Sequence, residues 1–544
     1  MGLVCSVFMV LLAALYFMNS SDVAMFAIPT ARNDDRLFIE LATALVRGSW
    51  FGPYDSLTLA KSPGYAFWLA ACHVLGMPLL FAQKLLYLLA CTLLVRVLPA
   101  CRVNRWFCLI IYAALLFIPV MTTQQMLRVY RSSIHPALIV LLISVMIRHF
   151  LVDPPARKAP FLAWGVFSGC VTAAFWLNRE EGICALPLVV CLAISLLCSL
   201  RRQDGRARLK SVLFAAFPFL VGAGLVLSVA ALNRAKFGVF TCCEIKSSPD
   251  ASAMEALQSI KTERLPYVTV SRAACDLAGE ASPAFKELRP CLEKVWAKWS
   301  ATSPEDIPRP ENEIAGGWFP WALRDAAQLA GHHYSAPMAE AFYTTIAAEL
   351  NRAFAAGTLA KDDSPFLLGF LLSREMLRGT VKQLPEAIRK SVTFWGCDAI
   401  PFYSRGPQSG VLEIERFTGS RMEASEETAP PGYFDDREGD RTRRHAIWLG
   451  YSYFVPWISI LGVAGFVIAT CLLLTRRKTS SLYFLCGGLF LYLLALLLCL
   501  CMIHTSSFHT LAPLYLSTCY PLVVLCSILS ICLPFLGTVP RHRT

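Results

Sequence analysis

Three charged side chains with the means to do chemistry lie close together near the start of the chain. Two adjacent carboxylates, Asp34 and Asp35, precede an amphipathic stretch, and Lys61 follows it, just before an aromatic run. A carboxylate can take a proton from a hydroxyl or stabilise developing positive charge, and a lysine binds phosphate as a point charge. The alternative for the two acids is capping of the helix that follows, worth about 1 kcal/mol. The pair by itself leaves both roles open.

Further charged side chains recur in two later polar connections. Arg128 and Arg131 lie in one of them, and Arg179, Glu180 and Glu181 end an apolar run in the other. Arginine binds phosphate through bidentate hydrogen bonds, and glutamate oxygens can position an acceptor or hold a divalent cation. The alternatives are arginines that anchor the membrane boundary and a hydrated turn between two helices.

Two histidines and two tryptophans complete the set of candidates. His504 and His509 flank the last polar connection, and His509 is the one that we assign to substrate binding. A histidine at such a position is more often structural than catalytic. Trp318 and Trp321 lie in the motif GGWFPW of a long polar segment, where they either dock that segment on the membrane or line a cleft.

These residues have to be positioned by a very apolar chain. Hydrophobic residues make up 56% of the 544 residues, and the formal net charge is +12. This composition excludes an ordinary soluble globule, because several apolar runs reach the length of about 20 residues that crosses a bilayer. The cations lie mainly in the short connections between those runs, where they set membrane topology and do not indicate nucleic-acid binding.

Windows of about 17–25 apolar residues predict ten membrane-spanning segments. They are residues 3–19, 78–98, 105–121, 134–151, 160–177, 183–200, 211–232, 447–474, 480–502 and 510–535. Most of the cationic connections fall on one side, which the positive-inside rule assigns to the cytoplasm together with both termini. The opposite side receives residues 20–64, 122–133, 178–182, 233–446 and 503–509, so all the candidate residues share that side.

The long polar insert, residues 240–445, is charged, punctuated by proline and mostly patterned as helix. Spacing predicts helices over Ser335–Phe354 and Phe366–Leu377. The first of these carries an apolar stripe, which we expect to pack the core of the insert: Met338, Phe342, Ile346 and Leu350. Residues 420–446 are rich in Glu, Pro, Asp and Arg, which is typical of a linker.

Four short motifs follow one another along residues 1–240. Asp34-Asp35-x-x-Phe38, with Ala42 and Gly48-x-Trp50 after it, comes first, and Lys61–Leu69, Arg179–Gly182 and Asn233–Phe240 follow. In order and in sidedness they resemble the D-E-x-x-Y…A…G-x-W, K-P-P-L-x-Y-W-L, [RK]-x-E-G and N-x-x-x-[FY]-G-x-F patterns of polytopic class C (GT-C) glycosyltransferases. That group includes the aminoarabinose and protein O-mannosyl transferases.

The resemblance implies a GT-C fold, a polyprenyl-phosphate sugar donor and an inverting transfer on the extracytoplasmic face to a lipid, glycan or protein acceptor. By position, Asp34 matches the catalytic Asp of the family, Asp35 its adjacent acid, and Lys61 a lysine near the donor phosphate. Glu180 or Glu181 would position the acceptor or a divalent cation, which is the one cofactor considered.

We therefore expect an α-helical polytopic membrane protein of GT-C type, with about ten transmembrane helices and a mainly helical extracytoplasmic insert. The expected parts are a catalytic membrane module (1–239), the insert (240–445) and C-terminal transmembrane helices (446–544), in a bacterial inner membrane. Two other functions stay open. One is a transporter or lipid flippase, which would place ionisable groups deep within the spans. The other is a non-catalytic assembly protein on a degenerate GT-C scaffold.

Overall fold

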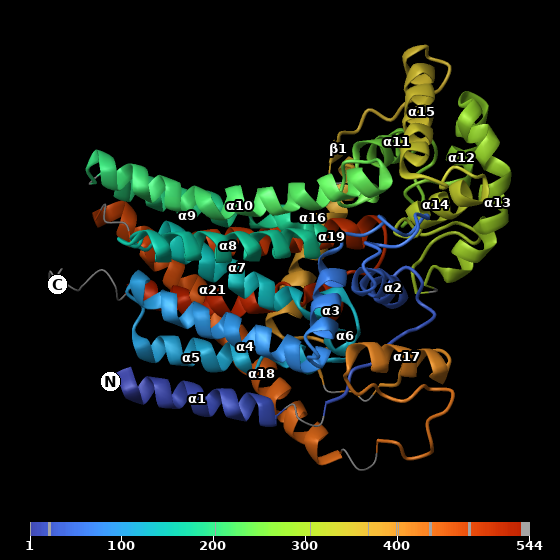
Figure 1. Ribbon diagram of the computed structural model, residues 1–544. Coiled ribbons are helices and arrows are strands. Elements are labelled where there is room, and N and C mark those ends of the chain that lie inside the picture. The colour runs from blue at the N-terminus through green and yellow to red at the C-terminus, as the bar shows by residue number, and fades with distance from the viewer. Residues whose placement is uncertain are drawn as a thin grey trace.

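A bundle of long helices forms the body of the molecule (Figure 1). The computed structural model describes residues 2–19, 23–201, 203–304, 306–367, 369–398, 400, 402–434, 438–476 and 480–534. The bundle helices are α1 (Gly2–Met18), α4 (Leu79–Val97), α5 (Arg105–Leu116), α7 (His135–Phe150), α8 (Lys158–Asn178), α9 (Leu186–Leu200), α10 (Gly205–Phe237), α18 (Glu438–Arg476), α19 (Ser481–Ser506) and α21 (Tyr520–Cys532).

Nine of the predicted spanning segments largely coincide with an apolar helix, whereas the last, 510–535, is helical mainly over α21 (Tyr520–Cys532). Within the described residues, seven helices are long and apolar enough to cross a membrane, and three apolar helices are shorter, Leu3–Met18, His135–Phe150 and Tyr520–Cys532. The predicted class, an α-helical membrane protein, agrees with this architecture, and the number of spans stays a prediction.

Burial separates the helices that face surrounding lipid from those that face protein. Helix α7 is buried on almost every side, because it packs against α4, α8, α9 and α10. Helices α10 and α18 instead expose large apolar side chains, among them Leu220 and Trp457. An apolar surface of this extent is stable in contact with lipid and unstable in contact with water.

Two glycines allow α18 and α21 to approach closely. A Cβ atom at Gly462 would lie 2.7 Å from the Ser527 carbonyl oxygen, and one at Gly465 would lie 2.5 Å from that of Ser530. Small residues at such a spacing let helix backbones touch, which is the usual device for packing helices where water supplies no driving force.

A second hydrophobic core lies outside the bundle, within residues 253–359. Five helices build it, and we call them the polar domain: α11 (Ser248–Gln258), α12 (Arg272–Ala281), α13 (Pro283–Thr302), α14 (Phe319–Leu329) and α15 (Ala336–Ala355). Figure 1 shows this domain at one end of the bundle, together with α2, α3 and α17, whereas α1 begins at the opposite end. The candidate site lies at the end that carries the polar domain.

The predicted helix over Ser335–Phe354 is confirmed as α15, with one correction to its buried stripe. Phe342, Ile346 and Leu350 are buried, but Met338 is exposed, because Ala339 faces the core in its place.

The predicted helix over Phe366–Leu377 is wrong. Residues 366–367 and 370–371 form two short antiparallel strands, β1 (Phe366–Leu367) and β2 (Phe370–Leu371), and α16 (Arg374–Val392) begins only afterwards. Gly369, at φ +90°, adopts a conformation that suits a turn and not a helix.

In the stretch 420–446 that was interpreted as a linker, residues 420–425 pack into the fold, and the last part begins α18. Met422 and Ser425 are buried, and Met422 pairs with Met25 near the start of the chain. Helix α17 (Gln408–Thr418), which precedes this stretch, also contributes buried side chains to the core of the bundle. The interpretation as a linker rested on charge, and the charged residues here surround a buried backbone pairing.

Candidate functional site

The two adjacent carboxylates lie at the start of α2 (Asp35–Val46), as the apolar spacing predicts. Asp34 is the residue before the helix, but its side chain makes no capping hydrogen bond. It forms ion pairs with Lys61 and Arg128 instead. The Asp35 carboxylate is completely buried and accepts a hydrogen bond of 2.9 Å from the Ile28 amide. The Asp34 side chain therefore does not cap α2, which was the alternative role.

A short extended segment, residues 25–28, brings Arg128 to these acids. The Phe26 amide donates to the Leu127 carbonyl (3.0 Å), and the Val129 amide donates back to the Phe26 carbonyl (3.2 Å). Arg128 consequently faces the start of α2. The Arg128 Nε donates to Asp35 Oδ1 at 2.6 Å, and Arg128 Nη2 donates to Asp34 Oδ2 at 3.3 Å. One guanidinium thus joins both carboxylates, as a planar fork of donors can.

Lys61 approaches Asp34 from the other side. It precedes α3 (Gly64–Val74), whose start touches the end of α8, since a Cβ at Gly64 would lie 2.6 Å from the Leu177 carbonyl oxygen. The ammonium pairs with Asp34 and is surrounded by three aromatic rings, with centroids at 5.2 Å (Tyr130), 5.4 Å (Trp321) and 5.8 Å (Phe38). Aromatic faces stabilise a cation that is largely removed from water.

Arg179 and Glu181 lie next to this cluster. Arg179 is buried, and it holds Glu181 through two hydrogen bonds of 2.9 and 2.5 Å. It also donates to the Ser132 hydroxyl at 3.2 Å, beside Arg131. Arg179 therefore does not extend to the membrane–water interface, which was the alternative role. Four of the predicted cations and three of the predicted carboxylates lie in one region: Lys61, Arg128, Arg131, Arg179, Asp34, Asp35 and Glu181.

The two adjacent aspartates have very different acidities. Burial raises the pKa of Asp34, but Lys61, Arg128 and Arg131 outweigh burial and lower it to about 2. Burial raises the pKa of Asp35, Arg128 offsets only part of this increase, and the negative charge on Asp34 increases the pKa further. The resulting pKa is about 6. Asp34 is therefore charged at every physiological pH, whereas Asp35 exchanges a proton not far below neutrality.

This difference predicts a pH dependence of stability. The pKa of Asp35 lies above its ordinary value of 3.8, so its contribution to folding is complete below about pH 4 and is lost as the pH rises through about 6. Two pKa units correspond to about 3 kcal/mol. The thermal unfolding midpoint in detergent should fall between about pH 4 and 6.5, and the fall should be smaller in Asp35→Asn, in which Asp34 remains as a partner for Arg128. Equal pH slopes in both proteins would contradict this assignment.

Some predicted site residues lie elsewhere. His509 is partly exposed, stacks on His504 at 5.1 Å and lies 3.3 Å from Asp306, so it does not join the cluster. Trp318 packs on Phe508. The side chain of Glu180 lies outside the described part of the structure.

Sequence reasoning missed two tyrosines. Tyr130 presents its ring to three cations, Lys61, Arg128 and Arg131. Tyr515, within α20 (Pro513–Leu516) in the last part of the chain, lies near enough to Asp34 and Arg179 for their charges to act on its hydroxyl. No sequence motif marked either residue, although Tyr130 lies between two residues that the charge pattern did mark.

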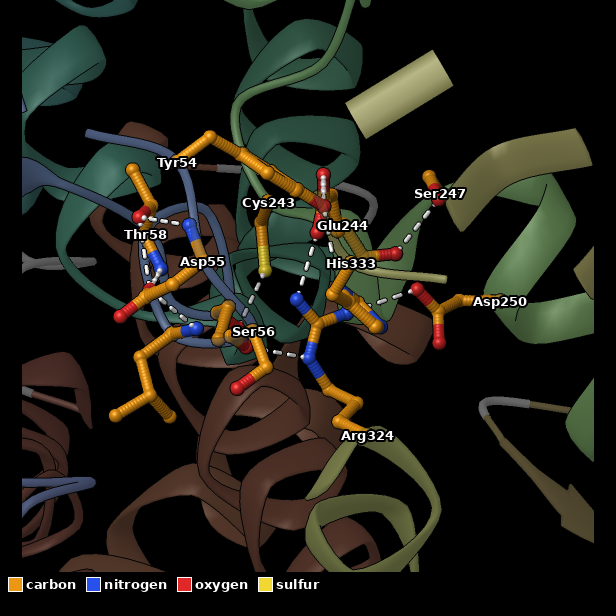
Figure 2. A network of polar contacts seen from close by, with 12 residues as sticks. Tyr54, Asp55, Ser56, Thr58, Cys243, Glu244, Ser247, Asp250, Arg324 and His333 are labelled. Carbon is orange, nitrogen blue, oxygen red and sulfur yellow. Dashed lines mark hydrogen bonds and ion pairs between the residues drawn. The ribbon is translucent and has the colours of Figure 1, made fainter. Parts of the chain in front are cut away.

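A second polar network joins the polar domain to the loop that precedes Lys61, and Figure 2 shows it. Arg324 of α14 is buried between two carboxylates, at 2.6 Å from Glu244 and 3.1 Å from Asp250. Its Nε donates to the Ser56 carbonyl at 2.8 Å. Tyr54 donates to Glu244 at 2.8 Å. Nothing in the sequence distinguished Arg324 from the surface arginines of the polar domain.

The described residues contain no group of three or more His, Cys, Asp or Glu side chains arranged to hold a metal ion. Glu181 is already bound by Arg179 through both carboxylate oxygens. The cluster at Asp34 is, in contrast, rich in cations. An anionic ligand fits these residues better than a divalent cation does.

Comparison with family models, curated proteins and solved structures gives no match. The class of the protein is therefore defined by its own features. It is a helical membrane protein in which cations surround a pair of carboxylates at one end of the bundle, the end that carries the polar domain.

Proposed function

We propose that this protein is a membrane glycosyltransferase of GT-C type that moves a sugar from a polyprenyl phosphate to an acceptor. The observation that supports the proposal most directly is the position of the Asp34 carboxylate between Lys61 and Arg128. A carboxylate can take the proton of a hydroxyl acceptor, and cations can stabilise the charge on a departing phosphate. The two requirements meet at one place, at the end of an apolar bundle suited to a lipid tail.

In the proposed reaction, the acceptor oxygen attacks the anomeric carbon from the side opposite the phosphate. The carbon–oxygen bond to phosphate breaks, its electron pair stays on the phosphate oxygen, and the acceptor proton passes to Asp34. Lys61 and Arg128 stabilise the charge on the departing phosphate. Attack from the opposite side inverts the anomeric configuration.

Donor binding also sets the basicity of Asp34. While Lys61 and Arg128 face Asp34 alone, its pKa of about 2 makes it a weak proton acceptor. A bound phosphate shares both cations, which weakens their hold on the carboxylate and raises its pKa. Asp34 thus becomes an effective base only when the donor is in place, which restricts proton transfer to the productive complex.

The remaining assignments complete the proposal. Glu181, fixed by Arg179, orients the acceptor, and the polar domain recognises the acceptor, which is a lipid, a glycan or a protein. The protein crosses a bacterial inner membrane ten times with both termini in the cytoplasm, and the site opens on the extracytoplasmic face. The excess of lysine and arginine in the connections at the other end of the bundle supports this orientation.

The test is transfer of a labelled sugar by the purified protein in liposomes. A panel of polyprenyl-phosphate sugars is supplied together with membrane extract as the source of acceptor, and sugar nucleotides serve as the control donors. We expect one lipid-linked sugar to be consumed and the sugar nucleotides to be left intact.

The same vesicles distinguish the other functions. A lipid flippase would move the donor between leaflets without breaking the sugar–phosphate bond, which a leaflet-specific quencher of a fluorescent donor measures. An assembly protein would neither consume nor move a donor. Either of these results with a folded protein overturns the proposal.

A further inference from the structure

Helix α14 of the polar domain presents three side chains to the loop that leads to Lys61. Trp321, Arg324 and Gln328 are spaced by three and four residues, so they share one face of the helix. The Trp321 ring lies 5.4 Å from the Lys61 ammonium. Arg324 donates to the Ser56 carbonyl, and Gln328 accepts from the Ser56 amide at 2.9 Å. A single helix thus contacts both the ammonium and the backbone five residues before it.

The segment before α11 holds the same loop at two further points. The Glu244 amide donates to the Leu59 carbonyl at 2.8 Å, and the Cys243 thiol lies 3.4 Å from the Ala60 carbonyl oxygen. Arg324 fixes this segment as well, because it binds the Glu244 carboxylate. The backbone that ends at Lys61 is therefore held by the polar domain at Ser56 (Figure 2), and by the segment before α11 at residues 59 and 60.

We propose that Trp321, Arg324 and Gln328 are positioning residues, through which the polar domain fixes the Lys61 ammonium at the distance from Asp34 that donor binding requires. This inference rests on the proposed function for its catalytic consequence, but the positioning itself does not depend on it. A lysine has a long flexible side chain, and its ammonium is held in one place only if both its backbone and its surroundings are fixed.

The placement of Lys61 can be measured without any turnover. In the intact protein Lys61 is buried and ion-paired, so a water-soluble amine-acylating reagent should modify it slowly. Gln328→Leu removes the acceptor of the Ser56 amide, and Trp321→Leu removes one ring from the ammonium. Each should raise the rate of acylation at Lys61 by about fivefold or more, read by mass spectrometry of the digested protein.

Matched controls keep this readout specific. Trp321→Phe retains an aromatic face and should behave as wild type. Asp325→Asn lies on the same helix but contacts Lys298 and Trp299, so it should leave Lys61 unchanged. The exposed lysines Lys286 and Lys382 calibrate the reagent, so their acylation should not change in any variant, and a thermal unfolding scan reports general unfolding.

Donor kinetics supply the second measurement. Gln328→Leu should raise the KM for the lipid-linked donor by about tenfold with a smaller change in kcat, and it should have no further effect in a Lys61→Met background. Unchanged acylation of Lys61 in both leucine variants overturns the positioning role. Faster acylation without any turnover in wild type keeps the positioning role and overturns the proposed glycosyl transfer.

Discussion

Asp34→Asn is expected to lower the turnover of the lipid-linked donor by about a thousandfold, within the range by which positioned acids and bases accelerate reactions. Asparagine has nearly the same shape but cannot take the acceptor proton, and it offers no charge to Lys61 and Arg128. Because these cations are then free to bind phosphate, the KM for the donor should stay the same or fall while kcat collapses. Initial rates in liposomes over a range of donor concentrations measure both quantities.

The matched control is Glu40→Gln, on the helix α2 that follows Asp34. Glu40 is an exposed carboxylate paired with Arg36 one turn away, and its loss should leave kcat within about twofold of wild type, because exposed pairs contribute little. A thermal unfolding scan shows whether Asp34→Asn is folded. If a folded Asp34→Asn protein turns over as fast as wild type, the carboxylate serves only to hold Lys61, and a different residue must take the proton.

Arg324→Met is expected to destabilise the polar domain by about 3–5 kcal/mol, the cost of leaving buried charges without their partner. Arg324 is almost completely buried, as are the two carboxylates that it joins, Glu244 and Asp250. Burial already raises the pKa of Asp250 to about 7 in the presence of Arg324. Without the guanidinium, which lowers this pKa, Asp250 should bind a proton at neutral pH. Hydrogen–deuterium exchange of α11, α14 and α15 measures the loss of stability.

Two further variants decide whether this loss comes from the buried charges. Arg389→Gln removes an exposed arginine that pairs with Glu386, and it should change stability by less than about 0.5 kcal/mol. Adding Glu244→Gln and Asp250→Asn to Arg324→Met removes the uncompensated charges, and the triple variant should recover part of the stability. An effect of Arg324→Met no larger than that of Arg389→Gln contradicts the assignment.

Hydropathy and periodicity predicted the helices of the bundle well, because a long apolar segment in a membrane can satisfy its backbone hydrogen bonds internally only as a helix. The helix that begins at Asp35, and most of the buried face of α15, followed from spacing alone. The charge bias of the connections placed Asp34, Lys61, Arg128 and Arg179 on one side of the membrane. The structure shows that they lie close together at one end of the bundle, which predicted sidedness alone could not establish.

The contacts that complete the site depend on pairing between distant segments, and no local pattern encodes such pairing. Residues 25–28 carry no motif, yet their backbone sets the position of Arg128. Arg324 resembles a surface arginine in sequence, and only the packing of α14 against the loop at Ser56 reveals that it is buried. The short hairpin at 366–371 was missed because its apolar residues fit a helical spacing equally well.

The pairing of residues 25–28 also determines when the site can form during synthesis. The Ala27 amide donates to the Ser404 hydroxyl at 3.3 Å, across 377 residues of chain. At the usual rate of about 5–20 residues per second, the ribosome needs roughly 20–75 seconds to make that intervening chain. Until then, residues 25–28 of the nascent chain lack their contact with Ser404. This is the segment that positions Arg128 beside Asp34 and Asp35. The contacts around residues 25–28 should therefore stay incomplete in a newly inserted protein until Ser404 has been synthesised.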